Sequence, residues 1–190
     1  MRPLIVSEFV TLDGVMEAPG GEPGHLHTGW AVPFMGEDQV AWKLREAEQA
    51  GALLLGRVTY ESFAGAWPGR SGAFADRMNA LPKHVVSTTL QPPLWAGTRL
   101  IRDDIAGQVA ALKQADGGPL LVAGSRMLVH SLLAHDLVDE IHLLVFPVAV
   151  GSGRRLFPET PVMTRLALRH AEAFANGVML HQYAVQHGAG

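Results

Sequence analysis

The chain has no cysteine among its 190 residues. That absence excludes disulfides, thiolate metal sites and a cysteine nucleophile, and it is compatible with a reducing compartment. Basic residues are not in excess either, because the formal net charge at pH 7 is -3. Non-specific nucleic-acid binding needs a concentrated basic surface, so this composition argues against a nucleic-acid partner.

Long hydrophobic runs are also missing. No stretch approaches the roughly 20 apolar residues of a membrane span, and the N-terminal apolar stretch is too short for a signal peptide. These absences predict a soluble, cytoplasmic protein. The motifs Gly-x-Gly-x-x-Gly and Gly-x-Ser-x-Gly do not occur, so neither the usual dinucleotide fingerprint nor a hydrolase elbow is supported.

The apolar and charged fractions, 48% and 17%, are those of a folded chain, and the length fits one domain spanning 1–190. Short apolar runs alternate with helical patterns, and Asn176-Gly177 is a strong hairpin signal near the end. Predicted strands cover 3–10, 52–55, 83–87, 98–101, 120–123, 139–148, 163–174 and 178–186. Predicted helices cover 37–50, with Val40, Leu44 and Ala47 along its apolar stripe, 57–64, 125–134, and a stretch that Asp103 or Asp104 can cap and that runs to about 115. This order predicts a three-layer α/β fold, with a mostly parallel sheet and an antiparallel C-terminal hairpin.

Ligands of open α/β sheets bind beyond the carboxyl ends of the strands, and three such corners carry suggestive residues. At the first, Gly56 ends a strand and a helix begins, so free amides favour an anion there. Arg57 adds a forked cation suited to phosphate, and Thr59 adds a hydroxyl. The alternative is an ordinary turn with a surface arginine.

The other two corners are Ser87-Thr88-Thr89 and Ala123-Gly124-Ser125-Arg126. The hydroxyls of the former could bind a phosphate or a ribose, or simply form a turn. Arg126 lies in a first helical turn, a poor place for a cation unless an anion is near. Together the three corners predict a dinucleotide, and arginine beside hydroxyls favours NADPH over NADH.

These motifs occur in the order seen in the dihydrofolate reductase-like superfamily. The chain resembles most closely the branch that contains the reductase domain of bifunctional riboflavin-biosynthesis proteins, the RibD C-terminal domain. The resemblance covers nearly the whole chain. It rests on Thr11-Leu12-Asp13-Gly14-Val15, Leu55-Gly56-Arg57-Val58-Thr59-Tyr60-Glu61, Val86-Ser87-Thr88, Ala123-Gly124-Ser125, Val138-Asp139-Glu140-Ile141, Pro147 and Gly151-Ser152-Gly153-Arg154-Arg155-Leu156-Phe157.

The resemblance implies a dihydrofolate reductase-like sheet of about eight strands, NADPH as hydride donor and a homodimer. By position it implies phosphate contacts for Gly56, Arg57 and Thr59, and places Ser87 and Thr88 near the 2′-phosphate. It places the pyrophosphate against residues 123–126, with Met127 nearby, and the nicotinamide and substrate beside residues 10–14, which include Val10 and Gly14. The family's glycine turn usually carries more glycine than Ala123-Gly124-Ser125-Arg126 does.

Hydride transfer usually also needs a proton source or an acid that grips the substrate. Asp13, in a glycine-flanked turn, and Asp38, at a helix start, are the candidates, and Glu37 competes with Asp38. An Asp-Gly turn and an exposed first-turn acid are their structural alternatives. Candidate substrate contacts are Trp30, Phe34, Gly151 and Gly153, although aromatic core packing and an ordinary loop would also explain them. His25-x-His27 lacks a clear third ligand, so no metal is predicted.

The sequence therefore predicts an NADPH-dependent reductase of a pyrimidine- or pteridine-type molecule. The most specific expectation, implied by the resemblance, is a 5-amino-6-(5-phosphoribosylamino)uracil reductase of riboflavin biosynthesis. The deaminase domain that precedes the reductase in the bifunctional proteins is missing from this chain. The alternative is a non-catalytic dimeric nucleotide-binding or sensor module of the same fold.

Overall fold

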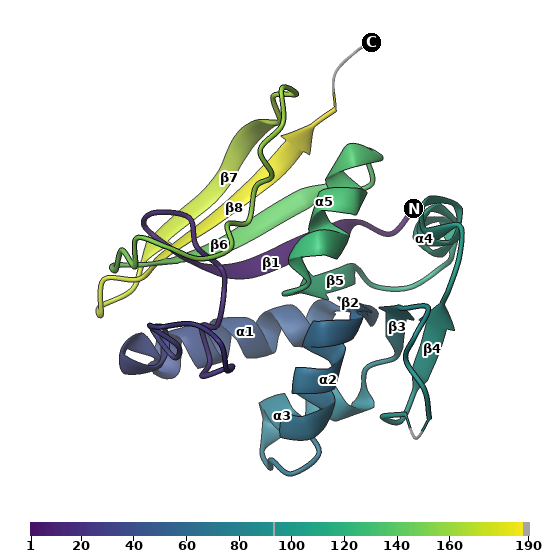
Figure 1. Ribbon diagram of the computed structural model, residues 1–190, viewed down its shortest axis with the longest axis horizontal. Coiled ribbons are helices and arrows are strands. Elements are labelled where there is room, and N and C mark those ends of the chain that lie inside the picture. The colour runs from purple at the N-terminus through teal and green to yellow at the C-terminus, as the bar shows by residue number, and fades with distance from the viewer. Residues whose placement is uncertain (93, 188–190) are drawn as a thin grey trace.

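The computed structural model describes residues 1–92 and 94–187. An eight-stranded sheet in the order β4-β3-β2-β5-β1-β6-β8-β7 forms the middle of the molecule (Figure 1). Only β8 is antiparallel to its neighbours, β6 and β7, which confirms the predicted fold class. The strands are β1 (Leu4–Thr11), β2 (Ala52–Gly56), β3 (Lys83–Val86), β4 (Thr98–Ile101), β5 (Leu120–Ala123), β6 (Glu140–Phe146), β7 (Arg165–Ala173) and β8 (Met179–Gln186).

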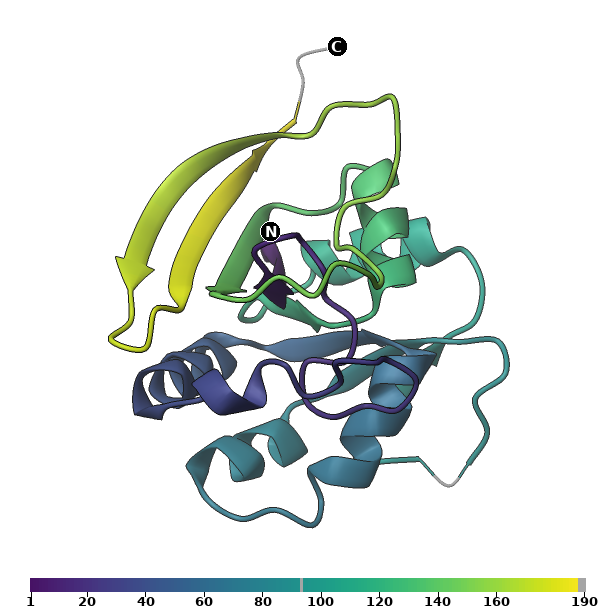
Figure 2. The same ribbon diagram turned by 60° about the vertical axis from the view of Figure 1, so that its left-hand side comes forward.

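Helices cover both faces of the sheet (Figures 1 and 2). On one face lie α1 (Glu37–Gln49), α2 (Arg57–Ala66) and α3 (Ala73–Ala80), and on the other lie α4 (Ile105–Gln114) and α5 (Arg126–Ala134). Alternate residues of β2 point to opposite faces of the sheet. Leu53 packs on the side of α1 to α3, and Leu54 packs on the side of α4 and α5. No helix in the described part of the chain is both long and apolar enough to cross a membrane.

The sequence patterns missed two elements and misjudged the buried face of one. The helix α3 and the short 3-10 helix η1 (Val32–Phe34) were not predicted. Of the predicted apolar stripe of α1, Ala47 is buried, but Val40 is 42% exposed. The buried face also carries Gln39 and Glu46, because both polar groups find hydrogen-bond partners there, in Asn176 and Ser7 respectively.

The central strand β1 has neighbours of unequal length on its two sides. Its pairing with β5 ends at Ser7 opposite Ala123, whereas its pairing with β6 continues to Thr11 opposite Phe146. Residues 8–11 of β1 therefore extend past the end of β5, and we call this the β1 edge. Strand order reverses at this point, and such a switch point is where open α/β sheets bind ligands.

Candidate functional site

The predicted corners at β2 and β5 form one structure, which we call the strand-end cradle: Gly56, Thr59, Gly124 and Ser125. The amide of Gly56 donates a hydrogen bond of 2.7 Å to Ser125 Oγ. A Cβ on Gly124 would lie 2.8 Å from Thr59 Cγ2 and Oγ1, and a Cβ on Gly56 would lie 3.2 Å from Ser125 Oγ. Gly124 and Ser125 both have left-handed backbone, with φ of 66° and 67°. The two turns approach closely because glycine removes the side chains between them.

Both helices that leave the cradle begin with an arginine. Arg57 is half exposed and pairs with Glu61 at 2.8 Å, one turn along α2. The Nε of Arg126 donates to the carbonyl oxygen of Arg155 at 3.2 Å, so the loop before β7 reaches the start of α5. Met127 is 71% exposed beside it. Two helix N-termini with adjoining guanidinium groups make this an electropositive corner.

The third predicted corner, after β3, is held by an arginine that the sequence patterns overlooked. Ser87 Oγ accepts hydrogen bonds from the amides of Thr89 and Leu90, so part of its capacity forms the turn. Arg102, directly after β4, donates to the carbonyl oxygens of Thr88 and Leu90. The sequence did contain a signal for this contact, because Arg102 follows the predicted strand β4, which pairs in parallel with β3. Exposed hydroxyl and guanidinium groups thus lie together at Thr88 and Arg102.

Asp13 anchors two loops beside the β1 edge. Its carboxylate accepts hydrogen bonds from Thr11 Oγ1 at 2.5 Å, from the amide of Gly151 at 2.8 Å and from the amide of Val150 at 3.3 Å. The Thr11 hydroxyl, and then these amides, hold the pKa of Asp13 below its ordinary value, although burial opposes the shift. An ionised acceptor with three donors fits the predicted turn role better than that of a proton source.

The glycines predicted near the nicotinamide and substrate shape the same loops. Gly14 closes a tight turn, with φ of 80° and its amide bonded to the carbonyl oxygen of Thr11. A Cβ on Gly153 would lie 2.7 Å from Val15 Cγ1 and 2.9 Å from His25 Nε2, whereas the position at Gly151 is open. These loops, which cross beside one another in Figure 2, therefore border the end of β1, where Val10 is buried.

The other predicted substrate and acid residues lie apart from the cradle. Asp38 and Glu37 are exposed in the first turn of α1. Trp30 is 7% exposed in a cluster with Phe146, which Phe34 also contacts, and its indole donates to the carbonyl oxygen of Glu17. Their surroundings match the core and helix-start alternatives. His25 Nε2 contacts the carbonyl oxygen of Ser152, and no metal-binding cluster occurs within 1–92 and 94–187.

Two buried acids near the middle of the sheet were not predicted. The first is Glu8 of β1, which is 5% exposed and points to the α5 side, next to Gly124. Burial raises the pKa of its carboxyl to about 8, an effect that the charge of Lys43 and a hydrogen bond from the Gly124 amide partly oppose. Its Oε1 has no hydrogen-bond partner among the described residues. The signal was a charged side chain inside a strand that carries no other charge.

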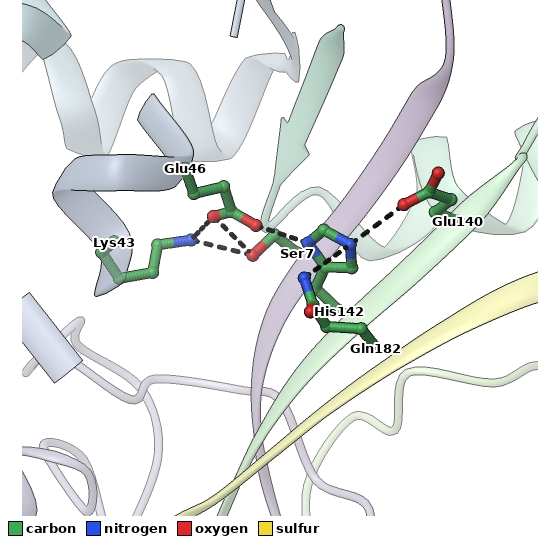
Figure 3. Close-up of polar contacts among 6 residues, drawn as sticks. All are labelled: Ser7, Lys43, Glu46, Glu140, His142 and Gln182. Carbon is green, nitrogen blue, oxygen red and sulfur yellow. Dashed lines mark hydrogen bonds and ion pairs between the residues drawn. The ribbon is translucent and has the colours of Figure 1, made fainter. Parts of the chain in front are cut away.

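The second acid, Glu46, belongs to what we call the α1 network: Ser7, Lys43, Glu46, Glu140, His142 and Gln182 (Figure 3). Glu46 lies 2.5 Å from Lys43 Nζ and 2.8 Å from His142 Nδ1, and it accepts from Ser7 Oγ. Burial raises the pKa of Glu46, but the Lys43 charge and the hydrogen bonds outweigh it and hold the pKa below its ordinary value. Lys43 and Glu46 are an i, i+3 pair on one helix face, a pattern visible in the sequence.

A model of the RibD C-terminal domain family matches residues 2–180, and the chain belongs to that family. The chain is 39% identical over 182 residues to the uncharacterized protein YwjB of Bacillus subtilis (strain 168). That match covers 95% of this chain and 97% of YwjB.

Solved structures of distant sequences share the fold. A putative riboflavin biosynthesis protein from Shewanella sp. PV-4 matches with a TM-score of 0.74 and 20% identity, over 98% of this chain and all of that one. A Thermotoga maritima diaminohydroxyphosphoribosylaminopyrimidine deaminase/5-amino-6-(5-phosphoribosylamino)uracil reductase matches with a TM-score of 0.65 and 14% identity, over 97% of this chain and 57% of that one. Enterococcus faecalis dihydrofolate reductase complexed with NADP(H) matches with a TM-score of 0.56 and 16% identity, over 96% and 94% of the two chains. The dihydrofolate reductase-like fold expected from the sequence is thus confirmed.

Proposed function

We propose that this protein is an NADPH-dependent reductase of a pyrimidine- or pteridine-type small molecule. The observation that carries the proposal is the strand-end cradle, where Gly56 and Gly124 bring two strand ends together at two helix N-termini. A pyrophosphate suits this place, because amides and the positive ends of two helices converge on it. Arg57 and Arg126 add charge at its margins.

The adenosine end of the dinucleotide would then lie along the ends of β3 and β4. Arg102 donates some of its N–H groups to the carbonyl oxygens of Thr88 and Leu90, and the residue is exposed to solvent. A guanidinium beside hydroxyls favours a ribose that carries a 2′-phosphate, and therefore NADPH over NADH. Thr88 and Ser87 would be the neighbouring hydroxyl groups.

The reactive end would lie at the β1 edge, bordered by Val10, Gly14 and the loop that Asp13 anchors. A bound reduced nicotinamide supplies a hydride there. The α1 side of β1 offers the substrate polar groups, Ser7 and Lys43, whereas the α5 side is apolar around Glu8. Membership of the RibD C-terminal domain family and the fold shared with the Thermotoga bifunctional enzyme support a pyrimidine substrate.

The test is NADPH oxidation at 340 nm with 5-amino-6-(5-phosphoribosylamino)uracil and, separately, with dihydrofolate. We expect turnover with at least one heterocycle and a slower reaction with NADH. Saturable NADPH binding without turnover on either compound would favour a non-catalytic nucleotide-binding module. Failure to bind NADPH at all would overturn the proposal.

We also propose that the protein pairs as a homodimer through the sheet. The α5 side of β6, β7 and β8 keeps several apolar side chains only partly buried, while Leu168 of β7 is 56% exposed. The partly buried residues are Leu143, Val145, Leu166 and Val185. A second copy on this face would cover them. Light scattering should give twice the chain mass at micromolar concentration, and a monomer would contradict the pairing.

A further inference from the structure

The α1 network, whose side chains are drawn in Figure 3, runs between two places in the molecule. One is a cleft of about 300 Å³ between α1 and the starts of β1 and β5, and Glu46, His142 and Gln182 line it. The other is the β1 edge, which the ammonium group of Lys43 approaches by lying 5.9 Å from the ring of Phe9. Between them run continuous contacts from Glu140 through His142 and Glu46 to Lys43.

His142 has partners that suit both of its protonation states. Its Nδ1 faces Glu46 Oε1 at 2.8 Å. Its Nε2 lies 3.2 Å from an acceptor, Glu140 Oε2, and 3.3 Å from a donor, the amide nitrogen of Gln182. A neutral ring can accept from Gln182, and a protonated ring can donate to Glu140. The ring, 5% exposed, is therefore hydrogen-bonded in both states.

At the other end of the α1 network, the ammonium group of Lys43 has more N–H groups than it has acceptors among the described residues. Among the described residues its Nζ donates to Ser7 Oγ at 2.9 Å and to Glu46 Oε2 at 2.5 Å. An ammonium group carries three protons, so one N–H remains available. The side chain of Lys43 is 12% exposed, and Ser7 lies at the level where β5 ends. The remaining N–H is thus next to the place proposed for the substrate.

We propose that the α1 network is a proton relay that delivers a solvent proton to the reduced substrate through Lys43. The inference rests on the proposed reductase function. When carbon of a C=N or C=O bond gains a hydride with its electron pair, the π electrons move to the nitrogen or oxygen. That atom takes a proton from Lys43 Nζ, which becomes a neutral amine. His142 takes a proton at Nε2 from water in the cleft and gives its Nδ1 proton to Glu46 Oε1. The Glu46 carboxyl group turns and delivers that proton to the amine, and a turn of the imidazole ring then restores the tautomer that carries its proton on Nδ1.

The first test needs no substrate. Exchange of the Lys43 ammonium protons with water can be followed by nitrogen-15 NMR in wild type and in His142→Gln, with Glu172→Gln as a control. Glu172 forms a matched but exposed contact with His170 on β7. A relay predicts several-fold slower exchange in His142→Gln, because the path from the cleft is cut. A purely structural contact predicts equal or faster exchange, because the network loosens, and that result would overturn the proposal.

Glu140→Gln and Gln182→Leu serve the same purpose if His142→Gln does not fold, since each removes one partner of Nε2. Glu140→Gln should slow exchange, whereas Gln182→Leu should leave the path open. If both left exchange unchanged, the relay would be wrong.

The second test is kinetic and uses 5-amino-6-(5-phosphoribosylamino)uracil with NADPH. Lys43→Met should lower kcat by about 100-fold, the scale of general acid catalysis, with NADPH affinity within twofold of wild type. His142→Gln should lower kcat with KM unchanged and enlarge the solvent deuterium isotope effect. Unchanged kcat in both variants would overturn the relay. If wild type oxidises no NADPH with this compound, the substrate assignment fails while the exchange measurement still decides the relay.

Discussion

Ser7 and Glu8 are neighbours in β1, yet their side chains enter different surroundings. Ser7 faces α1 and joins a network in which Lys43, Glu46 and His142 satisfy one another. Glu8 faces the α5 side, among apolar residues, and its Oε1 has no partner in the described part of the chain. One strand thus carries a paired polar layer on one side and, on the other, an acid with one oxygen that has no partner among the described residues.

The difference shows that partners, more than burial, decide the charge of a buried carboxyl. Glu46 and Glu8 are both nearly inaccessible, at 8% and 5% exposure. Lys43 and the hydrogen bonds hold the pKa of Glu46 below its ordinary value, whereas burial raises the pKa of Glu8 to about 8. At neutral pH one side of β1 therefore holds an ionised carboxylate and the other a neutral acid.

The largest expected effect comes from removing the acid of Glu8. The folded protein retains this proton from the ordinary pKa of 4.5 up to about 8, so wild-type stability falls as pH rises through that window. At about 1.4 kcal/mol per pKa unit the loss approaches roughly 5 kcal/mol. Glu8→Gln has no carboxyl group to ionise, so it should not lose this stability and should be the more stable protein above pH 8. Urea unfolding from pH 4 to 9 checks this, with Glu172→Gln as control. Parallel curves for wild type and Glu8→Gln would contradict it.

On the opposite side of β1 the same kind of change should destabilise. Glu46→Leu leaves Lys43 and His142 without their shared partner, and breaking a buried pair costs about 3–5 kcal/mol. Glu48→Leu, two positions along the same helix and exposed, is the matched control. Urea unfolding at pH 7 measures both. A loss of stability no greater than that of the control would mean that the α1 network does not hold α1 to the sheet.

The charged groups at the strand ends are exposed, so water screens them and smaller effects are expected there than at the two buried acids. Arg102→Gln should weaken NADPH binding about tenfold, or about 1.4 kcal/mol, and leave NADH binding unchanged, because only NADPH carries the 2′-phosphate. Arg99→Gln, at an exposed position within β4, is the control. Isothermal titration of both nucleotides gives the answer. Equal losses for NADPH and NADH would place the 2′-phosphate elsewhere.

The smallest effect is expected at the exposed pair of Arg57 and Glu61, whose side chains are 45% and 48% exposed. Exposed pairs four residues apart in a helix contribute about 0.3–0.5 kcal/mol. Glu61→Gln should therefore change unfolding midpoints little, while freeing Arg57 and tightening NADPH binding about twofold at low salt. Weaker NADPH binding in Glu61→Gln would indicate that the pair itself positions the arginine for the nucleotide.

Much of the fold was predictable, because most strands carry apolar runs that end in glycine or polar turns. The first residues of β2, β3, β4 and β5 were predicted correctly, and Asp104, one of the two predicted caps, is the residue that caps α4. The missed α3 is short, has only two buried residues and follows a glycine with φ of 102°. Such a segment owes its helix to packing against its neighbours more than to a periodic pattern.

The backbone turns of the candidate site could be predicted from the sequence, but the contacts of its buried side chains could not. Gly56 and Gly124 could be found because a strand end followed by a helix start has a local signature. Glu8, Glu46 and His142 come from β1, α1 and β6, and their partners depend on how the sheet register aligns these elements. Asp13 has a local glycine-flanked signature, but the amides that bind it lie more than 130 residues away.

The most direct test of the account is a titration of the isotopically labelled protein with NADPH, followed through its backbone amide resonances. The account predicts saturable shifts that are largest at Gly56, Gly124 and Ser125, with smaller ones at Ser87 and Thr88, so that the responding residues trace the strand ends. Shifts confined to the cleft between α1 and the starts of β1 and β5, or no saturable shift, would contradict it.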